Sequence, residues 1–231
     1  QVLDDVINSA FGSAGQRCSA LRILYVPKDS AKGLIEGLKG ALATLVVGDP
    51  ADPATDIGPV IDAESRGILE AHLERLEKEA KVLARAEIAE TANTGHGTGD
   101  YFAPTIAEIP TPDFLESEVF GPILHIYRYD PEDLMTVAGK LAGRGFGLTL
   151  GVHSRIEAFA EDVIRLVPAG NVYVNRSITG AVVGVQPFGG EGLSGTGPKA
   201  GGPNSLIRYA SEQAISVNIA AQGGDPALLN L

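Results

Sequence analysis

Segments with the character of β-strands alternate with segments of helical period along most of this 231-residue chain. The first β-rich segment is ALRILYVP, residues 20–27. A helix is predicted directly after it, because apolar residues recur at spacings of three and four behind an Asp29-Ser30 cap: Leu34, Ile35, Leu38, Leu42 and Leu45. A strand followed by a helix is the building unit of α/β folds.

The same alternation continues as far as residue 175. A second helix is predicted over 63–80, with a charged outer face that extends to residue 87 and an apolar face formed by Ile68, Leu69, Leu73 and Leu76. Further strands are predicted at 123–129, 147–154 and 170–175. Between them, helices are predicted at 131–141, behind an Asp130-Pro131 cap, and at 156–166. The pattern predicts an α/β fold in which helices cover a largely parallel sheet.

From Thr179 to Pro203 the chain is too rich in Gly and Pro for regular structure, so a long loop is predicted. The loop contains a formal match to a dinucleotide-binding fingerprint at Gly190, Gly192 and Gly195. That fingerprint requires a strand before it and a helix after it. Neither is indicated here, and these glycines are predicted to be structural. A β-rich segment, residues 212–219, then leads into a polar tail.

Composition excludes several classes of function. The formal net charge of −11 argues against nucleic acid binding, which depends on clustered Lys and Arg. No apolar segment reaches the ~20 residues that span a bilayer, and the first residues do not resemble a signal peptide. One cysteine forms no internal disulfide, so a cytoplasmic protein is expected. No metal site is predicted, because the histidines lie far apart in the sequence: His72, His96, His125 and His153.

The single cysteine, Cys18, lies in the segment SAGQRCSALR, between a glycine turn and the first predicted strand. A lone cysteine is most often a small buried hydrophobic residue. Here the loop position and the neighbouring Arg17 favour the thiolate instead, because exposed amides and a cation stabilise its negative charge. Catalytic groups also concentrate on loops that a rigid scaffold holds. Cys18 is therefore a candidate nucleophile.

Four segments resemble motifs of the aldehyde dehydrogenase superfamily, in the order in which the family has them. Residues 11–27 resemble the segment in which a Gly-Gln-x-Cys loop presents the catalytic thiol. Residues 46–62 resemble the Val-Gly-Asp/Asn-Pro segment, and ESEVFGPIL at 116–124 resembles the Glu-x-Phe-Gly-Pro motif. QPFGGEGLSGTG at 186–197 resembles the Pro-Phe-Gly-Gly-x-x-x-Ser-Gly loop. The resemblance implies the aldehyde dehydrogenase catalytic-domain fold, with an active-site loop rich in Gly and Pro and a terminal β segment.

One branch of the superfamily is indicated. Residues 175–203 are similar to pyrroline-5-carboxylate dehydrogenases, and residues 190–231 look like the carboxyl-terminal part of bifunctional bacterial members, in which a flavin-dependent proline dehydrogenase comes first. The resemblance implies oxidation of glutamate semialdehyde, the open form of pyrroline-5-carboxylate, to glutamate with NAD. FAD is expected only in the upstream proline dehydrogenase part.

The resemblance also implies a division of the chain. Residues 1–210 correspond to the carboxyl-terminal half of the catalytic domain, and residues 211–231 to a terminal strand and tail that contact another subunit or domain. The NAD-binding domain, the asparagine of the oxyanion hole and the acidic general base are expected before residue 1. Alone, such a fragment is expected to bind NAD poorly.

Seven residues receive roles from the resemblance. Cys18 is the nucleophile that forms a thioester, and its own backbone amide is one donor to the oxyanion. Glu118 accepts hydrogen bonds from the nicotinamide ribose, and Phe120 packs beside the nicotinamide ring. The remaining four hold the substrate, three of them at its carboxylate and the last along its aliphatic stem: Ser19, Gly180, Ala181 and Phe188.

Three alternatives remain open from the sequence. A cysteine acyltransferase or hydrolase also uses a loop thiol, but no histidine in the sequence has the context of its base. A noncatalytic assembly module is the second alternative, with the terminal strand paired to another subunit. The third is another aldehyde specificity within the superfamily. The expected partners are glutamate semialdehyde, the upstream NAD-binding domain and further copies of the chain in a homo-oligomer.

Overall fold

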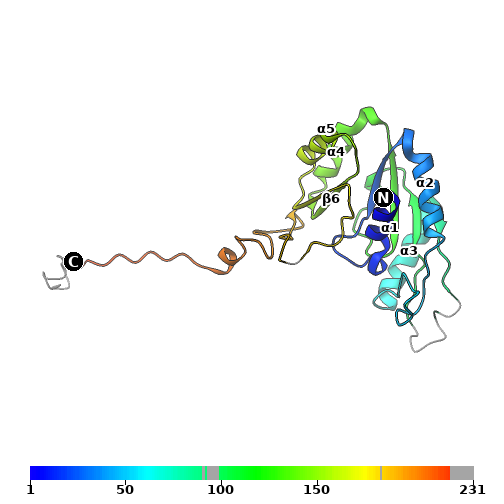
Figure 1. The fold of residues 1–231 in the computed structure, drawn as a ribbon, viewed down its shortest axis with the longest axis horizontal. Helices are drawn as coiled ribbons and strands as arrows, with labels where there is room; N and C mark the ends of the chain where they lie inside the picture. The colour runs from blue at the N-terminus through cyan, green and yellow to red at the C-terminus, as the bar shows by residue number, and fades with distance from the viewer. Residues whose placement is uncertain (90–91, 93–98, 183, 219–231) are drawn as a thin grey trace.

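The computed structural model describes residues 1–89, 92, 99–182 and 184–218 (Figure 1). One part is a four-stranded sheet with its helices, and a smaller part is built on the strand pair β6 and β7. The carboxyl-terminal segment extends away from both. Helices and strands alternate through the chain, so the predicted α/β fold is confirmed.

The main sheet has the strand order β1-β4-β3-β2, formed by Ile23–Pro27, Ile123–Tyr129, Thr105–Glu108 and Lys81–Arg85. The first three of these strands are parallel, and β2 is antiparallel to β3. The central strand β4 is buried from Ile123 to Ile126. A parallel strand covered on both faces has such a continuous apolar run, which is why β4 was recognisable in the sequence.

Helices cover both faces of this sheet. α1 (Val2–Phe11) and α2 (Lys28–Leu42) pack on each other and on β4. α3 (Ala63–Glu79) lies on the opposite face. Two observations place them: His72 of α3 contacts His125, while Arg128 lines a hollow with residues of α2. Side chains alternate along a strand, so residues three apart on β4 face opposite sides.

The smaller part is a β-α-β unit with an additional helix, α4 (Leu134–Gly143). β6 (Thr149–Val152) and β7 (Asn171–Val174) are parallel, and α5 (Glu157–Leu166) connects them. The two-residue strands β5 (Phe146–Gly147) and β8 (Glu191–Gly192) attach the Gly-rich loop to this unit. The described residues also form short 3-10 helices: η1 (Gly12–Gly15), η3 (Pro112–Phe114), η4 (Pro131–Asp133) and η5 (Leu206–Tyr209).

One of the two predicted helix caps, Asp29-Ser30, is wrong. The other is confirmed in position, because Asp130 is the N-cap residue of η4 and Pro131 starts that helix. α2 begins at Lys28, directly after β1, and its N-cap residue Pro27 has no side chain that can cap it. Asp29 instead lies in the first turn, where its carboxylate interacts favourably with the helix dipole. Asp130 makes no capping hydrogen bond either, and its carboxylate accepts a hydrogen bond from Lys28 Nζ at 2.6 Å. The Asp130 side chain thus binds a residue that is distant in sequence and does not bind the backbone of its own helix.

The charged segment 74–87 was predicted to be one face of a helix, but only its first part is helical. α3 ends at Glu79, Ala80 has an extended backbone, and Lys81–Arg85 forms the edge strand β2. Of the predicted apolar face of α3, Leu69, Leu73 and Leu76 are buried, whereas Ile68 is 59% exposed. The two short strands β2 and β3 were absent from the sequence prediction, because their five and four residues lack a distinct pattern.

The predicted terminal strand is not formed in this structure. Residues 211–218 are exposed, have no assigned strand and extend away from the rest of the molecule (Figure 1). A β-strand is stable only when its backbone groups pair with a neighbouring strand. Residues 219–231, which include the end of the predicted strand and the tail, lie outside the described residues.

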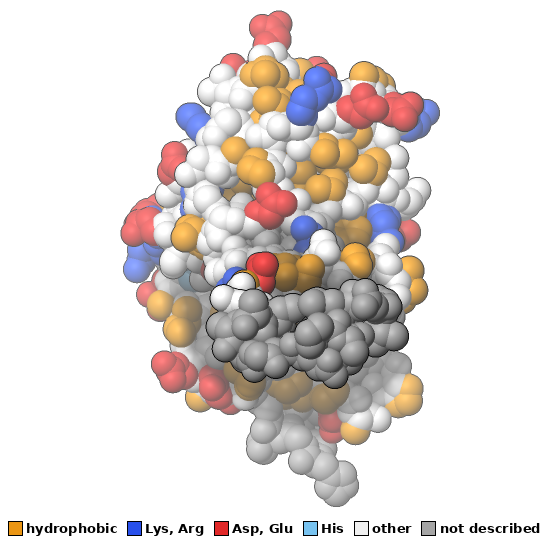
Figure 2. Space-filling view, turned by 90° about the vertical axis from the view of Figure 1, so that its left-hand side faces the viewer, with side chains coloured by type: hydrophobic (Ala, Val, Ile, Leu, Met, Phe, Trp, Pro, Cys, Tyr) orange, Lys and Arg blue, Asp and Glu red, His pale blue; other side chains and the backbone are white. Residues whose placement is uncertain are grey.

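Apolar side chains are exposed on the smaller part and on the segment that follows it. Figure 2 shows hydrophobic side chains at several places on the face from which the carboxyl-terminal segment leaves. The exposed apolar residues of the smaller part and of the segment that follows it include Phe146, Ile156, Leu193, Leu206 and Tyr209. Among the described helices, none combines the length and the apolar character needed to cross a membrane.

Candidate active site

The loop that carries the cysteine, residues 12–20 and called the thiol loop below, leaves α1 through a left-handed turn. Ser13, Ala14 and Gly15 have φ angles of 57°, 53° and 64°. This conformation costs roughly 1–2 kcal/mol for each non-glycine residue, so the surroundings must hold it. Gly15 is packed tightly enough to do so, because a Cβ added there would lie 2.2 Å from the Gly121 carbonyl oxygen. The predicted glycine turn is therefore a fixed turn.

Cys18 lies at the tip of the thiol loop. The Ala20 amide donates to the Arg17 carbonyl at 3.0 Å, which makes Cys18 and Ser19 the central residues of a turn. The turn's own hydrogen bond does not use the Cys18 amide. The thiol is exposed, whereas Ser19 beside it is 6% exposed. The structure thus favours an accessible thiol over a buried structural cysteine.

Gln16 connects the thiol loop to the segment 46–62. Its Oε1 accepts a hydrogen bond from the Ile61 amide at 2.9 Å, and its Nε2 donates to the Pro59 carbonyl at 3.5 Å. Two motifs about 40 residues apart in sequence therefore meet at the thiol loop, through the Gln of the Gly-Gln-x-Cys motif.

Arg22 connects the thiol loop to the segment that contains Glu118. Its guanidinium donates to the carbonyls of Gly15 at 2.6 Å and Arg17 at 3.1 Å. The same group binds the Glu118 carboxylate, with an Nη2 to Oε1 distance of 2.9 Å, and lies 4.7 Å from the centroid of the Phe120 ring. One side chain therefore fixes the loop of Cys18 against both predicted cofactor residues.

The partly buried cation near the thiol is not the one that the sequence suggested. Burial lowers the pKa of Arg22, and the charges of Glu118 and Cys18 oppose this shift. The Arg22 side chain is only 16% exposed. Arg17, the cation chosen from the sequence, is exposed and donates from Nε to Ser13 Oγ at 3.0 Å. The partly buried cation beside Cys18 is Arg22, which sequence adjacency could not identify.

Glu118 and Phe120 both remain accessible although Arg22 holds them. The Glu118 side chain is 52% exposed and Phe120 is 45% exposed. A half-exposed carboxylate accepts hydrogen bonds from hydroxyl groups, and an exposed aromatic ring offers a surface to a planar group. Both side chains are therefore accessible to a ligand.

Two histidines that lie 53 residues apart in sequence meet in the core next to Arg22. His72 Nε2 and His125 Nε2 are 2.9 Å apart, and His125 Nδ1 is 2.9 Å from the Arg22 carbonyl oxygen. Burial lowers the pKa of His125 to about 4, and the hydrogen bond to the Arg22 carbonyl opposes this. Both ring nitrogens of His125 are thus engaged. A structural role follows, because the base of a cysteine hydrolase must face its thiol.

The other histidines form no metal site in the part of the chain that the structure describes. His153 lies 3.8 Å from the Asp5 carboxylate, and His96 falls outside the described residues. No group of three or more His, Cys, Asp or Glu side chains in the described ranges is placed to hold a metal ion.

The segment 177–181, called the hydroxyl loop below, contains two of the predicted substrate residues. Ser177 Oγ is 3.0 Å from Thr179 Oγ1, and Ile178 and Thr179 are buried. Gly180 is exposed with a φ of 98°, and a Cβ added there would meet no protein atom within 4 Å. Glycine is required at this position by the backbone conformation. The backbone amides of Gly180 and Ala181 lie at this end of the hydroxyl loop, after the buried residues Ile178 and Thr179.

The other two predicted substrate residues, Ser19 and Phe188, differ in how they are connected to the thiol loop and the hydroxyl loop. Ser19 is joined to the smaller part, because Thr149 Oγ1 donates to its carbonyl at 3.5 Å. Phe188 belongs to a different turn, in which its backbone pairs with Ala200 through two hydrogen bonds of 3.0 Å. No hydrogen bond in the described part of the chain joins Phe188 to Ser19 or Gly180.

The glycines of the formal dinucleotide fingerprint have the predicted structural role. A Cβ on Gly195 would lie 1.9 Å from the Gly190 carbonyl oxygen, so these backbones pack directly on each other. Gly192, with a φ of 59°, belongs to strand β8 and starts no helix. The amides of this loop are therefore not arranged as in a dinucleotide-binding turn.

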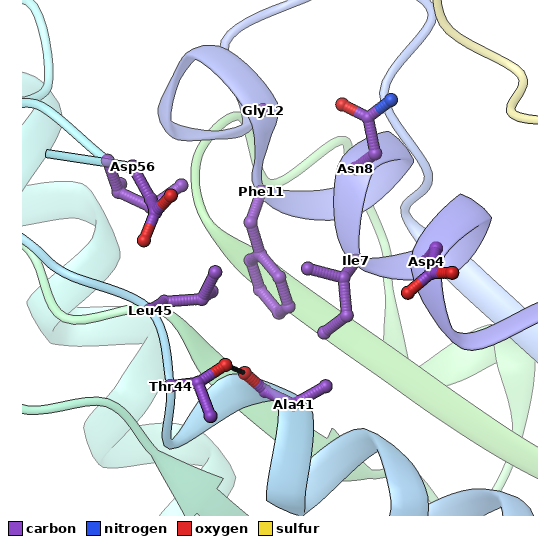
Figure 3. Close-up of a pocket in the computed structure, with 10 residues that line it drawn as sticks. Asp4, Ile7, Asn8, Phe11, Gly12, Ala41, Thr44, Leu45 and Asp56 are labelled. Carbon is purple, nitrogen blue, oxygen red and sulfur yellow. Dashed lines mark hydrogen bonds between the residues drawn. The ribbon is translucent and has the colours of Figure 1, made fainter. Parts of the chain in front are cut away.

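A surface cavity of about 370 Å³ lies beside the thiol loop but does not include the thiol. Figure 3 shows its lining side chains, which come from α1, from the end of α2 and from the segment around Asp56. Phe11 and Gly12 border both the cavity and the thiol loop. The reactive group therefore lies on an open loop, and the candidate site is defined by hydrogen bonds around the loop.

Residues 1–215 match the model of the Aldehyde dehydrogenase family, so the chain belongs to this family. It is 46% identical over 227 residues to the bifunctional protein PutA of Escherichia coli K12. It is 37% identical over 227 residues to the mitochondrial delta-1-pyrroline-5-carboxylate dehydrogenase of mouse. The predicted resemblance to this branch is confirmed.

Solved structures agree with these relatives. A crystal structure of a Bradyrhizobium japonicum proline utilization A (PutA) mutant matches 95% of this chain with a TM-score of 0.87 and 52% identity. A Thermus thermophilus 1-pyrroline-5-carboxylate dehydrogenase mutant matches 89% with a TM-score of 0.77 and 34% identity.

The chain corresponds to only part of these proteins. The matches cover 96% of this chain but 17% of the E. coli protein, and 93% of this chain but 38% of the mouse enzyme. In the solved structures the match covers 22% and 39% of the respective chains. The complete activity of such proteins therefore involves residues beyond those described here.

Proposed function

We propose that this chain supplies the thiol and the substrate-binding loops of an NAD-dependent glutamate-semialdehyde dehydrogenase that acts in proline catabolism. The observation that carries the proposal is Arg22, which binds the loop of the exposed Cys18 and the pair Glu118 and Phe120 at the same time. A thiol next to a cofactor-binding pair suits aldehyde oxidation through a thioester. The similarity to enzymes named pyrroline-5-carboxylate dehydrogenase supports the substrate.

Cys18 is the nucleophile in this proposal. Its thiolate attacks the aldehyde carbon, a C–S bond forms, and the carbonyl oxygen takes the negative charge. The Cys18 amide, which the turn leaves unused, donates to that oxygen. The second oxyanion donor and the general base are expected in residues outside this chain. Once the reacting carbon has lost its hydride to NAD, water would hydrolyse the resulting thioester to glutamate and return the thiol.

Glu118 and Phe120 are proposed to hold the cofactor. Their exposed fractions and their common contact with Arg22 fit a ribose hydroxyl pair next to a nicotinamide ring. The chemistry that bound NAD supplies is acceptance of the hydride from the reacting carbon, which leaves a thioester on Cys18. Arg22 keeps the two cofactor residues and the thiol loop in register, and such positioning lowers the barrier through orientation.

The substrate carboxylate is proposed to bind between the Ser19 hydroxyl and the amides of Gly180 and Ala181. Successive amides of a turn with a left-handed residue form an anion-binding nest. Phe188 is proposed to pack on the aliphatic stem. FAD belongs, in this proposal, to a proline dehydrogenase part of the complete protein, by analogy with the bifunctional relatives.

The carboxyl-terminal segment is proposed to contact another subunit of a homo-oligomer, and the rest of the chain to contact an upstream NAD-binding domain. Ile215 and Val217 are 76% and 53% exposed, and residues 211–218 form no strand within the described chain. A strand added to a neighbouring sheet would pair these backbone groups. Residues 1–210 are then the catalytic-domain half. We place the protein in the cytoplasm because its cysteine usage implies no oxidising compartment.

The nucleophile is tested by Cys18→Ser in the full-length protein. We expect loss of glutamate-semialdehyde oxidation by at least about 10³-fold, because a hydroxyl does not ionise near neutral pH as a thiol does. Ser30→Ala on the exposed start of α2 is the control. Turnover near that of the wild type in Cys18→Ser would overturn the proposal.

The cofactor residues are tested by Glu118→Ala in the same protein. We expect a fall in kcat of about 10-fold, with a smaller change in the KM for the aldehyde, because a ribose contact orients the nicotinamide. Glu116→Ala, whose exposed carboxylate binds Arg75 at 3.2 Å, is the matched control. Unchanged turnover and NAD affinity in Glu118→Ala would remove this residue from the cofactor site.

A further inference from the structure

Ser9 on α1 touches both loops of the candidate site. It is 2% exposed. Its hydroxyl is 2.9 Å from Ser177 Oγ and accepts a hydrogen bond from the Ile178 amide at 3.1 Å. Its carbonyl accepts a hydrogen bond from the Leu21 amide at 2.9 Å, directly after the thiol loop. One buried residue therefore binds the hydroxyl loop through its side chain and the end of the thiol loop through its backbone.

The position of Ser9 in α1 explains why both groups are available. α1 ends at Phe11, and the last four carbonyls of a helix have no partner within it. The Ser9 carbonyl is one of these, and the Leu21 amide satisfies it. The Ser9 hydroxyl lies on the buried side of the helix, and the hydroxyl loop supplies its partners, Ser177 Oγ and the Ile178 amide.

The hydroxyl loop depends on this contact at its base. Ser177 Oγ continues the chain of hydroxyls to Thr179 Oγ1 at 3.0 Å and accepts from the Thr179 amide at 3.3 Å. Ile178 is held on its other side by Gly151, where an added Cβ would lie 2.4 Å from Ile178 Cγ2. Gly180 comes directly after Thr179, and a Cβ added to it would have open space. The base of the loop is fixed and its tip is free to meet a ligand.

We infer that Ser9 is a positioning residue that sets the distance between Cys18 and the carboxylate-binding amides of Gly180 and Ala181, and thereby selects aldehydes whose carboxylate lies at one particular distance. The inference rests on the proposed function. Ser9 touches no substrate in this account, and it acts through the Ser177 hydroxyl and the Ile178 amide. A carboxylate and an aldehyde held at two fixed points give discrimination by chain length.

The test uses Ser9→Ala in the full-length protein and three substrates: glutamate semialdehyde, succinate semialdehyde, which is one carbon shorter, and propanal, which has no carboxylate. We expect kcat/KM for glutamate semialdehyde to fall about 10-fold, because one buried amide and one hydroxyl lose their partner. The value for propanal should change less than about 2-fold, and the preference for glutamate over succinate semialdehyde should shrink.

A second variant keeps the test informative if Ser9→Ala does not fold. Ser177→Ala removes the other partner of the same hydrogen bond from a half-buried position. It should reproduce the loss of chain-length preference, and the double variant should lose little more than either single variant. Ser154→Ala, whose hydroxyl hydrogen-bonds to the backbone of Ile156 in its own turn, is the control.

Two failures are distinguishable. If Gly180→Val selectively damages glutamate-semialdehyde oxidation but Ser9→Ala and Ser177→Ala lower all three substrates equally, the serines are merely structural and the inference is wrong. If Gly180→Val itself lowers propanal and glutamate semialdehyde equally, the carboxylate is bound elsewhere, and the substrate-binding part of the proposed function fails first.

Discussion

The thiol loop is fixed on three sides, whereas the hydroxyl loop is fixed only at its base. Gln16 and Arg22 bind the thiol loop to two other segments, and the Leu21 amide binds its end to α1. The hydroxyl loop depends on Ser9 and on packing around Ile178, and a Cβ added at its tip, Gly180, would meet no described atom within 4 Å beyond its chain neighbours. Both loops are predicted to hold the same substrate.

This difference separates two requirements of the chemistry. The attacking sulfur must lie within a few tenths of an ångström of its productive position, and the strained left-handed turn before it persists only in rigid surroundings. A carboxylate bound by amides at the surface tolerates more movement. In the proposed function the more tightly held loop carries the reaction, and the looser one carries specificity.

The largest expected effect is that of a substitution at Gly15, which tests whether the thiol loop is held rigidly. Gly15→Val places a Cβ 2.2 Å from the Gly121 carbonyl oxygen in a residue with φ of 64°. We expect destabilisation by roughly 4 kcal/mol, since steric overlap and left-handed strain add. Thermal unfolding and the yield of folded full-length protein measure this. A variant as stable as the wild type would show that the thiol loop is not held as described.

The second change acts on the loose loop. Gly180→Val meets open space, so we expect stability to fall by only about 1–2 kcal/mol from backbone strain. Catalytic efficiency for glutamate semialdehyde should fall roughly 10²-fold, because the charge-assisted contacts to the carboxylate are lost. A short aldehyde without a carboxylate should be affected much less.

Gly201→Val is the matched control for Gly180→Val. Gly201 also has a positive φ, 72°, and open space around it, but it lies outside the hydroxyl loop. Its substitution should leave both substrates nearly unchanged. Equal losses on both substrates in Gly180→Val would show that the hydroxyl loop is structural and that the carboxylate binds elsewhere.

The smallest predicted effect is a pH dependence of the folding stability of the four-stranded sheet and its helices, which hold the thiol loop. The pKa of His125 is about 4 in the folded protein, below its ordinary value near 6.5. The unfolded state therefore binds the proton first as pH falls, and folding stability decreases from about pH 6.5 towards pH 4. Between pH 7 and pH 5.5 this amounts to ~1 kcal/mol.

Hydrogen exchange of β4 amides measures this, once corrected for the intrinsic effect of pH on exchange. The loss of protection between pH 7 and pH 5.5 should be smaller in His125→Gln, and unchanged in the control His153→Gln. The same loss in His125→Gln as in the wild type would show that another group causes it.

The sequence was sufficient for the fold class and for the long elements, because buried strands such as β4 and apolar helix faces such as that of α3 have clear periods. It did not predict the contacts between residues that lie far apart in the sequence. Arg22, Ser9 and the His72–His125 pair act across distances of up to 169 residues, and their partners have no signature in local sequence. Resemblance to a family was needed to assign Glu118, Phe120 and Gly180 at all.

The central claim is that Cys18 carries the substrate as a thioester. It is tested most directly by acid quench of the full-length enzyme during turnover of glutamate semialdehyde with NAD, followed by mass spectrometry of its peptides. The account predicts a γ-glutamyl adduct on the peptide that contains Cys18, and none in Cys18→Ser. An adduct on another residue, or steady turnover by Cys18→Ser, would contradict it.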